Sequence, residues 1–170
     1  MVLDDSPCQM PLPAALALDT SGWHPELARL YRYWVTLCRP GVFAPLRHRF
    51  DPVAVPQQLS HIWMLDIQHE PEFRVRYRLL GTKVEEVLGR ALRGRWLDEC
   101  HSWARHSSYF TRYREVAETG VPSWRKGPPM FWHDKVGVIE NVILPLSETG
   151  RRVDHFLIES RFYRPDGEEI

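Results

Sequence analysis

The most restrictive feature of the chain is a seven-residue alternation, FRVRYRL, at residues 73–79. Apolar residues alternate strictly with three arginines over this segment. Successive side chains of a β-strand point to opposite faces, whereas a helix repeats every 3.6 residues. The segment therefore predicts a strand with its apolar face, including Leu79, in the core and its arginines facing outward.

Further strands are expected on both sides of this one. The apolar run at residues 59–67 precedes it across a polar turn at residues 68–72, which predicts an antiparallel hairpin. Beyond Gly120, apolar runs at residues 123–132, 136–146 and 152–163 predict three more strands, separated by glycine- and proline-containing turns.

Helices are expected at residues 24–39 and 102–119, where apolar residues recur at three- and four-residue steps. A short helix is expected at residues 82–88, where Gly81 ends the strand and Gly89 ends the helix. Two hairpin strands, a helical crossover and three strands predict an α+β fold. We expect a five-stranded antiparallel sheet with helices on one face and an extra N-terminal helix.

A chain of 170 residues is the size of one domain. We expect a flexible N-terminal tail at residues 1–22, a single domain at residues 23–163 and a C-terminal tail at residues 164–170. Within the domain, the helix at 24–39 is followed by a proline-rich connector at 40–58 and a core at 59–163.

Charge and composition limit the environment and partners. Lys+Arg and Asp+Glu are both 22, so there is no basic excess of the kind that nucleic-acid binding needs. No apolar run is long enough to span a membrane, and the acidic N-terminus does not resemble a signal peptide. Cys8, Cys38 and Cys100 are widely spaced, which predicts free thiols in a reducing compartment. We expect a cytoplasmic protein with neither nucleic acid nor membrane as partner.

Several segments match the pattern of one family in their order and spacing. They are YW at 33–34, FRVRYRLLGT at 73–82, LGR at 88–90, LRGRWL at 92–97, LPLS at 144–147 and VD at 153–154. Together they resemble the stand-alone PAS domains typical of alphaproteobacteria. The resemblance implies a PAS-like fold and a non-catalytic sensory or regulatory module of bacterial signal transduction. Such a module binds a small ligand, a partner signalling protein such as a histidine kinase, or both.

Aromatic residues point to a ligand pocket between the sheet and the helices, because ligand pockets are mostly apolar with a few polar groups. The candidate pocket residues are Tyr77, Trp96, Trp103, His106, Phe110, Tyr113 and Asn141. A close-packed core of the same side chains is the alternative that the sequence leaves open.

The N-terminal helix carries an apolar stripe that must be covered by this domain's own sheet or by a partner. Because the helix precedes the core strands, we expect the stripe to form a homodimer interface. The stripe consists of Leu27, Leu30, Tyr31, Trp34 and Leu37.

The sequence offers no catalytic residues and no metal site. The two histidines nearest to each other in the sequence, His101 and His106, are five residues apart, and no HExxH motif occurs. His106 is the single candidate haem ligand, and the sequence around Cys100 lacks the flavin photosensor motif. We therefore expect no required cofactor. The alternative functions are a small isomerase- or hydratase-like enzyme with an apolar pocket, and nucleic-acid binding by the arginines.

Overall fold

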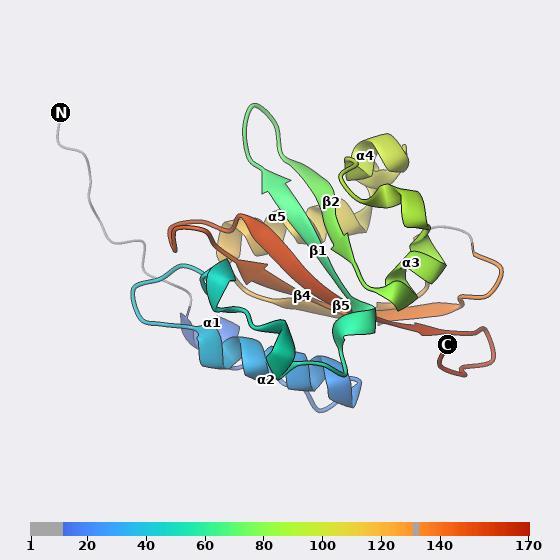
Figure 1. The fold of residues 1–170 in the computed structure, drawn as a ribbon, viewed down its shortest axis with the longest axis horizontal. Coiled ribbons are helices and arrows are strands. Elements are labelled where there is room, and N and C mark those ends of the chain that lie inside the picture. The colour runs from blue at the N-terminus through green and yellow to red at the C-terminus, as the bar shows by residue number, and fades with distance from the viewer. Residues whose placement is uncertain (1–11, 131–132) are drawn as a thin grey trace.

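The computed structural model describes residues 12–130 and 133–170. Residues 1–11, which include Cys8, and residues 131–132, at the end of the expected third strand, lie outside this part. Five strands form one antiparallel sheet in the order β2-β1-β5-β4-β3 (Figure 1). The strands are β1 (Ile62–Gln68), β2 (Arg74–Leu80), β3 (Ser123–Gly127), β4 (Val138–Leu146) and β5 (His155–Tyr163).

Five α-helices accompany the sheet in the described residues: α1 (Leu12–Leu16), α2 (Pro25–Leu37), α3 (Thr82–Leu88), α4 (Leu97–Cys100) and α5 (Ser108–Thr119). The predicted α+β fold is confirmed, including the hairpin and the helical crossover between β2 and β3. None of the helices in residues 12–130 and 133–170 has the length and apolar content to cross a bilayer.

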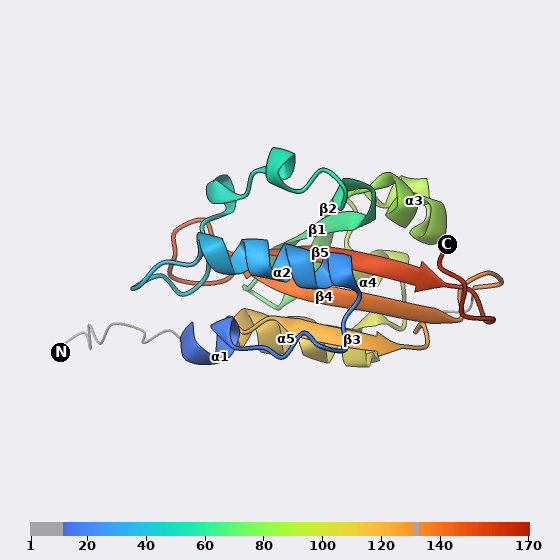
Figure 2. The same ribbon diagram turned by 90° about the horizontal axis from the view of Figure 1, so that it is seen from below.

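Both faces of the sheet are covered. α3, α4 and α5 lie on one face, which we call the inner face, and α2 lies on the other, the outer face (Figures 1 and 2). Each face has its own apolar core, because β4 and β5 direct alternate side chains to opposite sides. Phe156 and Ile158 belong to the inner core, whereas Leu144 and Leu157 belong to the outer core.

A β-bulge changes the expected alternation of β2. Met64 pairs with Leu79 and Leu65 pairs with Tyr77, so Arg78 is an extra residue in β2. A bulge of this kind reverses the side to which the following residues point. The expectation that Leu79 faces the core is therefore wrong, and Leu80 occupies that position.

The apolar stripe of α2 packs against the outer face of its own sheet. Leu27, Leu30, Tyr31 and Trp34 are buried, and Leu37 is half-buried. Trp34 Nε1 donates a hydrogen bond to the carbonyl of Pro145, at 2.8 Å. The expected homodimer interface on this stripe is therefore wrong, because the sheet already covers these side chains.

The expected N-terminal tail extends too far into the chain. Ala15 is buried, and Leu18 packs against the outer core. The hydroxyl of Tyr31 donates to the Ala15 carbonyl at 2.7 Å and accepts from the Leu18 amide at 3.2 Å. The segment from α1 onward is thus held by α2.

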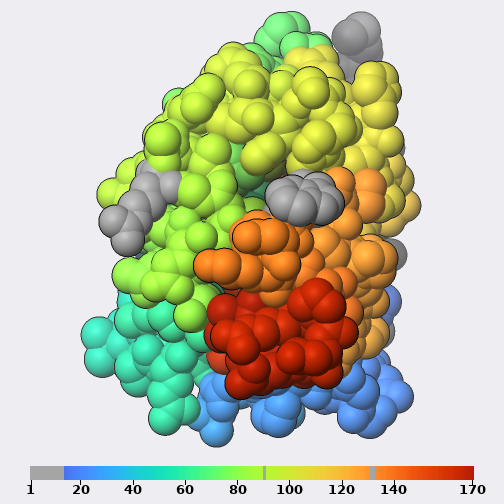
Figure 3. Space-filling model, turned by 90° about the vertical axis from the view of Figure 1, so that its right-hand side faces the viewer, coloured from blue at the N-terminus to red at the C-terminus, as the bar shows by residue number. Residues whose placement is uncertain are grey.

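The C-terminal segment is also part of the folded surface and not a free tail. The Ile170 amide donates to the Phe162 carbonyl at 2.9 Å, and Arg164 and Glu168 are joined through their backbones. Figure 3 shows this segment, in red, lying against the orange residues of the neighbouring strands. The polar composition of residues 164–170 conceals this backbone pairing.

Gly81 lies where β2 meets α3, and its backbone passes very close to η3, the 3-10 turn Leu59–His61. A β-carbon at Gly81 would lie 2.4 Å from the Leu59 carbonyl oxygen and 2.5 Å from that of Ser60. Overpacking of this kind typically costs about 1–3 kcal/mol, and more when the contacts are backbone atoms. We expect Gly81→Ala to reduce the free energy of unfolding by about 3 kcal/mol or more, measured by urea denaturation.

The matched control is Gly22→Ala, because a β-carbon at Gly22 meets nothing within 4 Å. This substitution should change the free energy of unfolding by less than about 1 kcal/mol. Equal effects of the two substitutions would contradict the close approach at Gly81.

Candidate functional site

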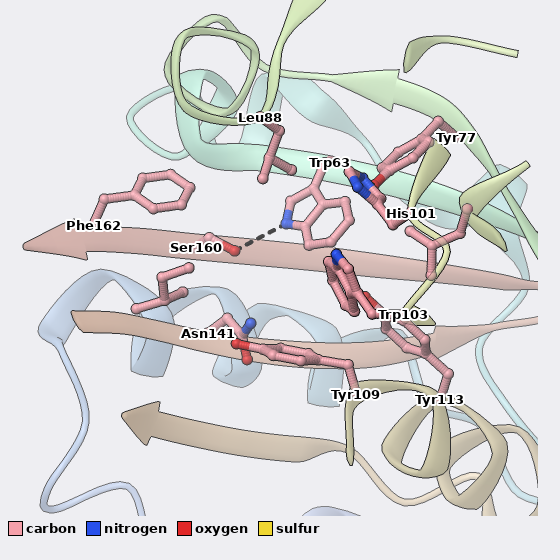
Figure 4. Close-up of a pocket in the computed structure, with 12 residues that line it drawn as sticks. Trp63, Tyr77, Leu88, His101, Trp103, Tyr109, Tyr113, Asn141, Ser160 and Phe162 are labelled. Atoms are coloured by element: carbon pink, nitrogen blue, oxygen red, sulfur yellow. Dashed lines mark hydrogen bonds between the residues drawn. The ribbon is translucent and has the colours of Figure 1, made fainter. Parts of the chain in front are cut away.

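A cavity of about 50 Å³ lies between the inner face of the sheet and the α3–α5 segment (Figure 4). Four strands and three helical segments contribute to its wall, which is mostly aromatic. The lining residues are Trp63, Tyr77, Leu88, Leu97, His101, Trp103, Tyr109, Tyr113, Ile139, Asn141, Ser160 and Phe162. A buried water needs roughly 10–15 Å³ by this measure, so the cavity is not filled by side chains alone.

Asn141 on β4 is the one residue with a side-chain amide among the described lining residues. Its Oδ1 accepts a hydrogen bond from Arg112 Nη1 at 3.1 Å, and Arg112 is itself fixed on Ser123 by two bonds of 3.0 Å. This contact orients the amide, because an arginine can only donate. Asn141 Nδ2 therefore remains a donor with no protein acceptor among the described residues.

Ser160 on β5 supplies a second polar group, and Figure 4 shows it beside Trp63. Ser160 Oγ accepts a hydrogen bond from Trp63 Nε1 at 2.9 Å. A hydroxyl can accept and donate at the same time. Within the described residues the Ser160 hydroxyl hydrogen has no acceptor, so the cavity wall presents two donors close to the sheet.

Tyr77 and His101 form a pair on the other side of the cavity. Tyr77 Oη and His101 Nε2 lie 3.1 Å apart, and their rings meet edge to face. Burial raises the pKa of the Tyr77 hydroxyl and lowers the pKa of the His101 imidazole. Both groups are thus uncharged near neutral pH, with Tyr77 donating to His101.

Among the residues that the structure describes, the cavity wall carries no charged group near neutral pH. Its described lining includes no Asp, Glu, Lys or Arg. Burial also raises the pKa of Tyr113, which keeps that hydroxyl protonated. An uncharged wall disfavours charged ligands, because a charge removed from water without a partner is costly.

Four of the seven sequence-predicted pocket residues lie on the cavity wall: Tyr77, Trp103, Tyr113 and Asn141. Trp96, His106 and Phe110 do not. Trp96 lies beyond β2, with the guanidinium carbon of Arg74 4.4 Å from its ring centroid. Phe110 packs edge to face on Phe73, with centroids 5.5 Å apart.

His106 is exposed because the long helix starts later than expected. The expected helix at residues 102–119 begins at Ser108, where Ser107 Oγ accepts from the Phe110 amide at 3.3 Å as an N-cap. Residues Ala104–His106 form a separate 3-10 turn, which changes the phase of the apolar stripe. The prediction of His106 as a pocket residue and as the candidate haem ligand is therefore wrong.

Sequence reasoning missed several wall residues, including His101, Ser160 and Phe162. The last two continue the inward-facing series of Phe156 and Ile158 on β5 at two-residue steps, so the strand alternation could have identified them. His101 lies in an irregular segment after α4, where no periodic signal exists.

No three His, Cys, Asp or Glu side chains within residues 12–130 and 133–170 are arranged to hold a metal ion. The outward-facing arginines of β2 are paired with carboxylates: Arg74 with Asp98 at 2.8 Å, and Arg76 with Asp66 at 3.2 Å. These ion pairs reduce the positive charge that a phosphate backbone would meet.

A model of the PAS domain family matches residues 23–152. The chain belongs to the PAS domain family. PAS domains are sensory and regulatory modules, which agrees with a five-stranded sheet that encloses a cavity under its helices. The match begins at residue 23, before α2, so the matched segment includes the N-terminal helix. Comparisons with curated proteins and with solved structures found no significant match.

Proposed function

We propose that this PAS domain is a non-catalytic sensor that binds a small uncharged molecule in the inner cavity. The observation that supports this most directly is that Asn141 Nδ2 and the Ser160 hydroxyl, two donors without an acceptor among the described residues, lie in a mostly apolar and aromatic wall. Such a wall suits a flat or compact molecule with a hydrogen-bond acceptor, such as an amide or ketone oxygen.

Ligand size follows from the cavity volume. About 50 Å³ is a third of the roughly 150 Å³ engineered cavity that takes benzene. A ligand of a few non-hydrogen atoms fits without movement. A single ring requires displacement of Leu88 and Trp103, which are only half-buried.

Acid–base catalysis is the alternative that the sequence left open. An enzyme of the isomerase or hydratase type uses positioned acids and bases in its pocket. In the described part of the chain, the wall offers one imidazole, His101, which is already paired with Tyr77, and no carboxylate. This arrangement favours binding over proton transfer.

The second part of the proposal concerns how the sensor passes its signal on. We propose that ligand occupancy is passed on by contact with another protein, either a signalling protein such as a histidine kinase or a second copy of the chain, in the bacterial cytoplasm. Native mass spectrometry, followed by denaturation and analysis of released small molecules, tests the sensor role. A discrete uncharged molecule supports it, and a released metal or charged cofactor contradicts it.

Asn141→Asp tests the role of the amide donor. Aspartate still accepts from Arg112, but it replaces the donor by an acceptor, so binding of an uncharged acceptor ligand should weaken at least about tenfold. The probes are acetamide and benzamide. Their binding is measured from the changes in the NMR signals of the Trp63 and Trp103 indoles. Acetate and benzoate are the charged counterparts of the same shape.

The matched control is Gln57→Glu, because glutamate likewise keeps the hydrogen bond that Arg29 donates to Gln57 on the surface, at 2.6 Å. We expect this control to bind both amides like the wild type. No response to either amide, or equal responses to the carboxylates, would refute an uncharged-ligand site.

A further inference from the structure

A groove of about 500 Å³ lies on the outer face of the sheet, beside β1 and β2. α2 packs on β4 and β5, so the groove is flanked instead by the connector, drawn in cyan and teal in Figure 2. The apolar part of its wall is formed by Phe50, Pro52, Leu59, Ile62, Met64 and Leu79. Leu79 points there because of the bulge at Arg78.

Exposed apolar side chains are concentrated at this groove. Five large apolar side chains are exposed in the described part of the chain, and Leu59 (39% exposed) and Leu79 (42%) line the groove. Val53, 80% exposed, adjoins the lining residue Pro52. A cluster of exposed apolar groups marks an interaction surface, whereas scattered ones do not.

The charged residues that line the groove, within the described part of the chain, are all arginines. Arg78 binds Asp66 at 3.2 Å and Arg47 binds Glu148 at 2.7 Å, and neither carboxylate is part of the wall. The third, Arg93, has no carboxylate partner within the described residues. The wall is therefore apolar and positive, although the chain as a whole has no net charge.

The two nearby carboxylates are shared with other donors. Asp66 also binds Arg76 at 3.2 Å, and His155 lies between the two acids, 2.8 Å from Asp66 and 2.6 Å from Glu148. Each carboxylate thus interacts with other donors as well as with its groove arginine. Positive potential remains at the rim, where it attracts negative charge.

We propose that this groove binds an acidic, apolar segment of a partner protein, with its apolar side chains on Leu59 and Leu79 and its carboxylates on Arg78 and Arg93. The proposal rests on the part of the proposed function in which output passes by contact with another protein. A second copy docking through the same face would place arginines against arginines. A flat lipid surface would not reach the floor of a groove.

Two pools of fluorescein-labelled nine-residue peptides test the proposal by fluorescence anisotropy. Both pools vary leucine, isoleucine, phenylalanine and methionine at alternate positions. One pool carries glutamate or aspartate at the other positions, and the second carries lysine or arginine. We expect the full chain to bind the acidic pool and not the basic pool.

Arg93→Glu should weaken binding of the acidic pool at least about tenfold, because it removes one favourable charge pair and introduces a repulsive one. Leu79→Glu should abolish it. The control Lys135→Glu reverses a charge on an exposed residue before β4, outside the groove wall, and should bind like the wild type. Circular dichroism checks that each variant is folded.

Binding of neither pool, or of both equally, would overturn the proposal. A wild-type dimer that Arg93→Glu dissociates would assign the groove to a second copy, and binding to anionic vesicles that Leu79→Glu abolishes would assign it to a membrane. Arg93→Glu should keep the wild-type response of the Trp63 and Trp103 signals to benzamide. The peptide test and the benzamide test therefore distinguish failure of the groove proposal from failure of the cavity proposal.

Discussion

Replacing Trp34 by alanine is expected to lower the free energy of unfolding by about 3–5 kcal/mol. Trp34 is 1% exposed at the centre of the outer core, and its ring stacks on Tyr31 with centroids 6.2 Å apart. Its removal leaves a large cavity between α2 and the sheet. The buried carbonyl of Pro145 also loses its hydrogen-bond donor.

Guanidinium denaturation followed by circular dichroism measures this effect, with Trp96→Ala as the matched control. Trp96 is half-buried beyond the edge of β2 and mainly contacts the guanidinium groups of Arg74 and Arg76. Its loss should cost about 1 kcal/mol. A comparable cost for both variants would mean that α2 does not bury Trp34 in solution.

Glu159→Gln is expected to stabilise the protein above pH 7 by an amount on the order of 3 kcal/mol. Glu159 is fully buried on the outer face of β5. Arg161 binds its Oε1, but Oε2 is buried without a hydrogen-bond partner. Burial raises the pKa of this carboxyl to about 7, opposed by Arg161 and assisted by the nearby acids Glu26 and Glu169.

The sign follows from proton linkage. The folded state binds the Glu159 proton more tightly than the unfolded state, whose pKa is near 4.5. The contribution of this group to stability is therefore complete below pH 4.5 and is lost as the pH rises to about 7. Glutamine has no proton to lose, so the difference in stability between the variant and the wild type should grow over this pH window.

Urea denaturation at several pH values between 4.5 and 8 measures that difference, and Glu140→Gln is the control. Glu140 is equally buried, and burial acts to raise its pKa. Four donors, from His24, Trp124, Lys126 and Tyr163, nevertheless bring the pKa below its ordinary value. Glu140→Gln should destabilise the protein at neutral pH, and a stabilisation of both variants would refute the role of the unpaired oxygen.

Periodic segments of the sequence predicted the fold well, because burial of one face leaves a regular pattern. The alternation at residues 73–79 predicted β2, and the three- and four-residue steps predicted α2. The stop signals at Gly81 and Gly89 predicted α3. The bulge at Arg78 could not be predicted, because it depends on the register between β1 and β2 and leaves no local signal. The late start of α5 is similar, since Ser107 and Ser102 are both acceptable caps.

An apolar stripe shows that a helix face is covered, but not by what. The stripe of α2 was interpreted as a dimer interface, and the structure shows that the sheet covers it. The same limit applies to the cavity. Aromatic residues indicated its region, and four of the seven candidates lie on its wall. The two hydrogen-bond donors of the wall could not be predicted, because they depend on how Asn141, Arg112 and Ser160 are arranged in space.

β4 and β5 form a partition between two compartments. On β4, Asn141 faces the cavity, while its neighbours Glu140 and Val142 face the helix on the other side. Successive side chains of the same strand are therefore constrained in turn by the cavity on the inner face and by α2 on the outer face. A backbone shift that changes the cavity on one face also moves the packing surface of α2 on the other face, so the cavity and the α2 interface cannot evolve independently.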